Sequence, residues 1–272
     1  MVADRLAEPL VGRRKTPALI GVVHLLPLPG APRTSPGIEG VIARARADLQ
    51  ALRDGWADAA IVENLGDAPF TAGPVDAFTV AAMARILGAL RDDAPGFALG
   101  VNILRNDASA ALAVAVATDA QFIRVNVHIG AMLTDQGVVT GEARQTLLER
   151  NRLDRADIAI AADVLVKHAV PLATQDIVEV AEDTYLRGAA DALIVTGRAT
   201  GKPLDPQNLS RIRQSLPHAP LWAGSGVSPE TAPQLRDLID AAIVGTYLHE
   251  EGDLLRPVDA VRVQQMRRAL TG

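Results

Sequence analysis

Polar and ionisable side chains stand at the ends of successive apolar runs, where a parallel sheet would bring them together. Two carboxyl groups in an apolar cavity can have their pKa values driven apart, which gives an acid and a base. We therefore predict that Glu63 and Asp163 transfer protons. The other predicted catalytic residues are Lys167, Arg124 and His24, and the predicted substrate-binding residues are Asn64, Asn102, Arg105, Asn126 and His128.

Strand alternation orients these side chains, because successive residues of a strand point to opposite faces. Arg124, Asn126 and His128 then share one face. Lys167 is in phase with Asp163, so we expect it to point inward and the adjacent His168 to point away.

Each of these ionisable residues also has a purely structural interpretation. Buried arginines are usually paired whatever the function, so Arg124 could simply form an ion pair with Asp163 or Glu63. Lys167 could likewise form a salt bridge that has no catalytic role. A catalytic Lys167 would be an electrophile toward phosphate or carbonyl, a general acid or a Schiff-base nucleophile.

Glycine and hydroxyl residues follow three late apolar runs, at residues 196–201, 224–226 and 245–246. Glycine lets backbone N–H groups approach an anion, and a helix N-terminus adds a favourable dipole. Ordinary tight turns would use the same glycines. We predict a phosphate site formed by Thr196, Gly197, Thr200, Gly201, Gly224, Ser225, Gly226, Gly245 and Thr246.

The candidate metal ligands do not form a recognisable motif. His24, His128, Glu63 and Asp163 are suitable residue types, but they come from separate strands with no spacing to test. We therefore predict neither a metal nor a cofactor.

The elements that position these residues alternate along the whole chain. Strand-like runs are expected at residues 17–24, 57–63, 97–102, 121–127, 158–166, 191–196, 220–223 and 241–245. Segments with helical spacing are expected at residues 39–53, 76–91, 107–118, 142–153, 175–187, 205–215, 229–238 and 256–270. This order predicts an α/β protein that folds as a single (β/α)₈ TIM-barrel domain over residues 1–272. Residues 1–16 of this domain are expected to be an N-terminal extension. A doubly wound open sheet fits less well, because no run suggests where the strand order would reverse.

Two connections are longer than usual, at residues 25–38 and 128–141. Each follows a strand, so both are expected as lids on the catalytic face.

Composition narrows the possible partners. The chain has 272 residues, a net charge of −5, 3% aromatic residues and no cysteine, which disfavours nucleic acid and excludes disulfides and thiolate sites. No apolar run is long enough to cross a membrane and no signal peptide is evident, so a cytoplasmic location is expected and any membrane contact would be peripheral. The alanine- and valine-rich residues 110–117 suggest exposed apolar surface and hence a homo-oligomer.

Long motifs in this chain resemble the BtpA/SgcQ family. They are GVVHL at residues 21–25, VENLGDAPF at 62–70, GVNILRND at 100–107, FIRVNV at 122–127, and residues 163–164, 166–172, 194–201 and 224–227. The resemblance covers nearly the whole chain. It implies a barrel related to ribulose-phosphate-binding enzymes. One branch of the family resembles photosystem I biogenesis factors of photosynthetic membranes, and another resembles sugar-metabolism proteins with a nucleosidase-like assignment.

The sequence therefore leaves two candidate functions for the protein. The first is an enzyme that acts on a small phosphorylated sugar or nucleoside-like compound by acid–base chemistry, as an isomerase, lyase or nucleosidase-like enzyme. The second is a non-catalytic biogenesis factor for a membrane complex of the photosystem I type, which would act through an outer surface patch.

Overall fold

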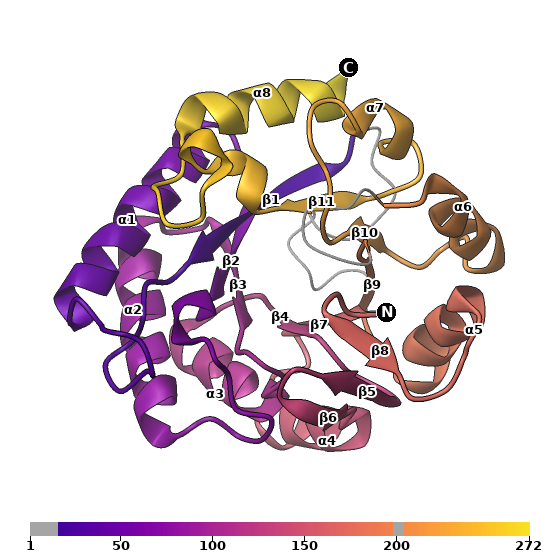
Figure 1. The fold of residues 1–272 in the computed structure, drawn as a ribbon, viewed down its shortest axis with the longest axis horizontal. Helices are drawn as coiled ribbons and strands as arrows, with labels where there is room; N and C mark the ends of the chain where they lie inside the picture. The colour runs from indigo at the N-terminus through magenta and orange to yellow at the C-terminus, as the bar shows by residue number, and fades with distance from the viewer. Residues whose placement is uncertain (1–15, 198–203) are drawn as a thin grey trace.

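Eight parallel strands close into a barrel, and helices surround it (Figure 1). The computed structural model describes residues 16–197 and 204–272, so the predicted N-terminal extension lies outside it apart from Thr16. The strands run around the barrel in the order β1 (Ala18–His24), β2 (Ala59–Glu63), β3 (Ala98–Asn102), β4 (Phe122–Val125), β7 (Ala159–Asp163), β9 (Ala192–Val195), β10 (Leu221–Ala223) and β11 (Ala241–Val244). The predicted (β/α)₈ fold is confirmed.

The helices of the outer layer are α1 (Ile38–Asp54), α2 (Ala77–Asp93), α3 (Ala108–Thr118), α4 (Ala143–Arg152), α5 (Ile177–Glu182), α6 (Pro206–Ser215), α7 (Ala232–Leu235) and α8 (Ala260–Thr271). Aspartates cap five of them by accepting a backbone N–H of the first turn: Asp76, Asp107, Asp176, Asp205 and Asp259. No helix in the described part of the chain is both long and apolar enough to span a membrane.

The helix α7 is much shorter than residues 229–238, where a helix was expected. The Thr231 hydroxyl accepts the Ser228 N–H, and the Thr231 N–H donates to the Ser228 carbonyl. These bonds close a separate turn, so the helix begins only at Ala232.

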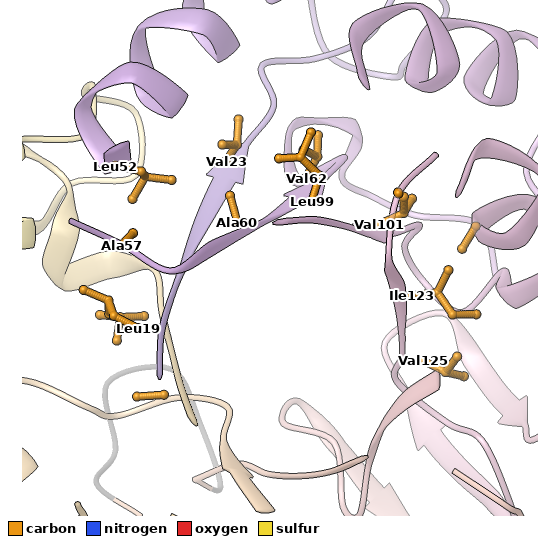
Figure 2. Packing of buried hydrophobic residues seen from close by; sticks show 14 of the residues in the cluster. Leu19, Val23, Leu52, Ala57, Ala60, Val62, Leu99, Val101, Ile123 and Val125 are labelled. Carbon is orange, nitrogen blue, oxygen red and sulfur yellow. The ribbon is translucent and has the colours of Figure 1, made fainter. Parts of the chain in front are cut away.

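The two faces of the barrel strands bury different side chains. Leu19, Val62 and Ile123 are among the outward residues that pack under the helices (Figure 2). The inward residues are mostly alanine and isoleucine, with Phe122 and Trp222 meeting edge to face at 5.7 Å between ring centroids. Two large rings therefore fill a barrel interior that the small side chains alone would leave loosely packed.

A small antiparallel sheet extends the C-terminal end of the barrel beside β4 and β7 (Figure 1). It consists of β5 (Ala131–Thr134), β6 (Gly137–Thr140) and β8 (Ala169–Pro171), in the order β6-β5-β8. The segment 128–141, expected as a lid, is largely a hairpin, because Met132 and Val139 bury one of its faces against Val127 and Val166. The segment 25–38 contains no helix or strand until α1 begins at Ile38.

The alanine- and valine-rich stretch on α3 does not give the exposed surface expected of it. Ala110, Ala111, Leu112, Val114 and Ala115 are buried within the chain. Only Ala113 and Ala117 of this stretch are exposed, so it adds little apolar surface, and the homo-oligomer stays a prediction.

Four similar hydrogen-bonded clamps hold the N-terminal end of the barrel. Asp58, Gln121, Asp191 and Asp240 stand immediately before β2, β4, β9 and β11, which are alternate strands of the barrel. The side-chain oxygen of each accepts a backbone N–H of the neighbouring strand at 2.8 Å, from Leu19, Leu99, Ile160 and Leu221 respectively.

An arginine from every second helix completes each clamp. The arginines are Arg267 of α8, Arg91 of α2, Arg150 of α4 and Arg213 of α6, which donate to the same four side chains at 2.6, 3.2, 2.6 and 2.6 Å. Each clamp thus joins two strands and one helix, and the arrangement gives the barrel an approximate fourfold repeat.

Removal of one acidic clamp residue should be costly. In the variant Asp240→Ala, Arg213 keeps a nearly buried charge without its carboxylate and the Leu221 N–H loses its acceptor. We expect the free energy of unfolding, measured by urea denaturation, to fall by about 3–5 kcal/mol. Asp93→Ala is the control, because Asp93 pairs with Arg46 on the exposed surface and should cost less than about 1 kcal/mol. Equal losses in the two variants would contradict the proposed role of the clamp.

Candidate functional site

A cavity of about 590 Å³ opens at the C-terminal ends of the barrel strands. This size is typical of sites for small molecules. Eleven of the predicted site residues line it: His24, Glu63, Arg105, Arg124, Asn126, Lys167, Gly224, Ser225, Gly226, Gly245 and Thr246. Six others do not line the cavity, namely Asn64, Asn102, His128, Asp163, Thr196 and Gly197. Thr200 and Gly201 lie outside the described residues.

Glu63 is the carboxylate that reaches the cavity from β2. It is nearly buried, and Asn102 on the adjacent strand β3 donates a hydrogen bond to its Oε2 at 2.7 Å. No arginine or lysine in the described part of the chain lies within ion-pair distance of it. Asn102 therefore orients the Glu63 carboxylate and is not itself exposed to the cavity.

The Asn64 side chain does not line the cavity and instead connects three loops. Its Oδ1 accepts the Leu104 N–H at 2.8 Å, and its Nδ2 donates to Asp67 at 3.0 Å. Asp67 also accepts the Leu28 N–H, and burial raises the pKa of its carboxyl group. Asn64 therefore orients the loops around the cavity, and its direct contact with a ligand stays a prediction.

Asp163 is committed to an ion pair below the cavity. Arg124 Nη2 lies 3.1 Å from both of its oxygens, and Asn126 Nδ2 donates to Oδ2 at 2.8 Å. Burial disfavours the charged guanidinium and so lowers the pKa of Arg124. The attraction of the Asp163 and Glu63 carboxylates raises it by more, so the pKa of Arg124 is raised overall. The structural alternative for Arg124 is thus realised, and Asp163 has no free oxygen facing a ligand.

Arg105, Lys167 and Arg262 line the cavity and lack such a partner in the described part of the chain. Arg105 and Lys167 have no carboxylate within ion-pair distance among residues 16–197 and 204–272, and Arg105 Nη2 donates to the Lys167 carbonyl at 2.9 Å. Burial lowers the pKa of both side chains, and for Lys167 the nearby Arg124 lowers it further. An anionic ligand would relieve this unfavourable concentration of positive charge.

The expectation that only one of Lys167 and His168 faces the cavity is wrong. The strand β7 ends at Asp163, and both residues lie in the turn that precedes β8, where His168 has φ of 57°. Strand alternation no longer applies in this turn, and both side chains line the cavity.

His128 was expected on the cavity face, and the structure places it elsewhere. The strand β4 ends at Val125, and the His128 ring turns to the Gly188 carbonyl, with Nε2 at 2.8 Å. The side chain is buried, and burial lowers its pKa. His128 therefore connects the hairpin to the end of the π-helical turn at Asp183–Arg187.

The predicted phosphate turns lie on three adjacent strands, and part of their hydrogen-bonding capacity is already used. The Gly224 N–H donates to the Val195 carbonyl, the Gly197 N–H donates to Ser225 Oγ, and the Thr196 hydroxyl donates to the Leu165 carbonyl. The short α7 does not start at the Gly224–Gly226 turn, so the helix dipole expected there is missing. The N–H groups of Ser225, Gly226, Gly245 and Thr246 make no hydrogen bond to another described residue.

Sequence analysis missed His249, which holds His24. The two rings are linked by His24 Nδ1 and His249 Nε2 at 3.0 Å, and His249 is fully buried. The contact joins residues 225 positions apart. The only sequence signal was the position of His249 shortly after the last strand.

Besides His168, four further charged or aromatic residues line the cavity without having been predicted there: Phe70, Asp135, Tyr247 and Arg262. The Arg262 guanidinium lies 4.4 Å from the centre of the Tyr247 ring. Among the residues that the structure describes, no group of three potential ligands could hold a metal ion.

Comparison with known proteins shows how this chain is related to others. The model of the BtpA family matches residues 15–272. The photosystem I biogenesis protein BtpA of Synechocystis sp. is 42% identical over 93% of this chain and 87% of the relative. The sgc region protein SgcQ of Escherichia coli is 32% identical over 94% of this chain and 94% of the relative.

A solved structure supports the fold independently. Orotidine 5'-phosphate decarboxylase from Pyrococcus horikoshii superposes with a TM-score of 0.58 at 13% identity, over 93% of this chain and 99% of the other. At this identity the likeness concerns the barrel alone. The family match and the two relatives extend over almost the whole sequence, so the chain belongs to the BtpA family.

Proposed function

We propose that this protein is a cytoplasmic enzyme that acts on a small phosphorylated sugar or nucleoside-like compound by acid–base chemistry. One observation carries the proposal. Glu63 lines the same cavity as Arg105 and Lys167, two cations that lack carboxylate partners in the described chain. Unpaired, partly buried cations cost stability unless a ligand uses them.

The phosphate group would occupy the turns after β10 and β11. These turns line the cavity and offer the N–H groups of Ser225, Gly226, Gly245 and Thr246. Loops after the last two strands of such barrels are a frequent phosphate location. Thr200 and Gly201, predicted for the same site from the sequence, lie outside the described residues.

Glu63 would transfer the proton, and Arg105 and Lys167 would hold the negative charge that develops on the substrate. Asp163 was expected to share proton transfer, but its contacts with Arg124 and Asn126 make it a positioning residue. Isomerisation and carbon–carbon cleavage need a base and a stabilised anion, whereas N-glycosidic cleavage needs a base for the attacking water and a donor that stabilises the departing nitrogen base. The proposal covers these three reactions.

The phosphate site can be tested with inorganic phosphate. Gly226 has φ of 70°, so Gly226→Val should distort the turn and weaken phosphate binding by about tenfold or more, since hydrogen bonds to charged groups contribute about 1.5–3 kcal/mol. Gly130→Val is a matched control, because Gly130 has the same φ of 70° but does not line the cavity. Isothermal titration calorimetry on both variants gives the affinities. Equal phosphate affinity in the two variants would place the anion elsewhere.

The proton-transfer role can be tested once a ligand is identified by mass spectrometry of compounds that co-purify with the protein. Glu63→Gln should lower turnover of that compound by about 10²–10⁴-fold and leave its affinity nearly unchanged. Asp163→Asn is the comparison, because it should mainly lower the free energy of unfolding by weakening the buried pair with Arg124. Near-normal turnover in Glu63→Gln would remove this carboxylate from the mechanism.

One specific observation favours the alternative of a non-catalytic assembly factor. Leu133 on β5 pairs with Val138 on β6 and with Val170 on β8, and all three side chains are at least half exposed. They form an apolar stripe on the outer face of the small sheet, and a relative is named as a photosystem I biogenesis protein. If this alternative is correct, Val170→Lys should abolish biological activity while phosphate binding persists, and Glu63→Gln should have no effect in the same complementation assay.

A further inference from the structure

The His24–His249 pair has one arrangement of protons that satisfies all of its contacts. His249 Nδ1 lies 2.6 Å from the Arg256 carbonyl oxygen. A carbonyl oxygen can only accept, so Nδ1 of His249 carries the hydrogen. Arg44 donates to the same carbonyl and also pairs with the buried Asp48, which fixes the peptide group in place.

The proton on His249 determines the proton on His24. A neutral His249 protonated at Nδ1 has its lone pair at Nε2, which lies 3.0 Å from His24 Nδ1. His24 must therefore donate from Nδ1, and its own lone pair is then at Nε2.

The surroundings keep both rings neutral near pH 7. Burial lowers the pKa of His24 well below its usual value, and the nearby His249, Lys167, Arg124 and Arg44 lower it further. Burial also lowers the pKa of His249. Both rings therefore stay largely unprotonated at neutral pH, and the single tautomer of each is maintained.

The free nitrogen of His24 lies beside the proposed phosphate turn. His24 lines the cavity, and its Nε2 makes no hydrogen bond to another described residue. A Cβ added to Gly245 would lie 3.3 Å from this nitrogen, so Nε2 borders the backbone of the turn after β11. The missing side chain of Gly245 leaves the approach to Nε2 open.

We propose that His24 accepts a hydrogen bond through Nε2 from the ligand of the cavity, and that His249 is the positioning residue that fixes this tautomer. The donor is a hydroxyl group or an acid proton on or next to the phosphate. The role of the ligand rests on the proposed function, whereas the tautomer rests on the contacts alone. The substrate class is narrowed to phosphorylated compounds that present a proton donor at this point.

The tautomers can be read from the nitrogen shifts of the rings. In two-bond ¹H–¹⁵N correlation spectra of histidine-labelled protein at neutral pH, we expect His24 to be protonated at Nδ1 and unprotonated at Nε2. His24→Asn assigns its signals. His128 is an internal reference with the opposite tautomer, because its Nε2 must donate to the Gly188 carbonyl. A His24 ring protonated at Nε2 would overturn the proposal.

His249→Phe tests the positioning role, since the phenyl ring keeps the bulk but offers no acceptor to His24. We expect the Nδ1–H tautomer of His24 to lose its dominance, while the His128 signals stay unchanged. An unchanged His24 tautomer would show that His249 does not fix it. The wild-type spectrum decides the tautomer even if this variant fails to fold.

The affinities for inorganic phosphate and sulfate show whether the anion site contains a hydrogen-bond acceptor. Phosphate keeps an O–H at neutral pH that can donate to such an acceptor, and sulfate has none. By calorimetry, the wild type should bind phosphate about tenfold more tightly than sulfate, as expected for one additional hydrogen bond. The preference should shrink in His249→Phe, because a His24 ring protonated at Nε2 can donate to an oxygen of either anion. Equal wild-type affinities would overturn the ligand role of His24. If neither anion binds, the proposed function fails, and the ring spectrum still decides the tautomer.

Discussion

The four clamps at the N-terminal end of the barrel are the constraint on which the remaining structure depends. Each clamp joins two neighbouring strands and one helix through a single carboxylate or amide, so the closure of the sheet and the seating of every second helix are set together. Buried polar bonds of this kind tolerate little displacement. With closure secured at one end, the opposite end can carry polar groups that are not fully satisfied. This division is typical of barrels in which one end provides stability and the other function.

The Arg124–Asp163 pair fixes the positions of side chains at the C-terminal end of the barrel, where the cavity lies. A buried pair adds little net stability compared with apolar side chains of the same size, but it has strict geometric demands. Asp163 accepts from both Arg124 and Asn126, so it presents these two side chains to the cavity in defined positions. Glu63 is held in a similar way by Asn102. The site is therefore built from residues that face the cavity and a second set of polar residues that orient them.

Sequence patterns predicted the architecture well, because eight apolar runs alternating with helical segments leave few folds available. They also placed most cavity residues, since strand ends meet at one end of a barrel. The errors come from extending strand alternation past the real ends of strands. The strand β4 ends at Val125 and β7 at Asp163, and beyond these points His128 turns away while Lys167 and His168 both turn toward the cavity.

Contacts between distant segments could not be predicted from one sequence. The acceptor residues of the clamps are unevenly spaced along the chain, so no period reveals the fourfold repeat. The small sheet forms only when β8 pairs with a hairpin more than two dozen residues earlier, and no local turn signal specifies that pairing. His249 likewise reaches His24 only because the last strand closes on the first.

The cavity is lined by more positive than negative side chains, although the whole chain has a negative net charge. The chain has a net charge of −5, yet cations predominate among the charged residues that line the cavity. Arg124 is neutralised by Asp163, which leaves Arg105, Lys167 and Arg262 facing the carboxylates of Glu63 and Asp135. An acidic protein repels anions over most of its surface, so a local excess of unpaired cations would favour anionic ligands at this cavity. The neutral His24 adds an acceptor without adding charge, so the proposed hydrogen bond from the ligand would let the cavity distinguish a protonated anion from one that has no proton to give.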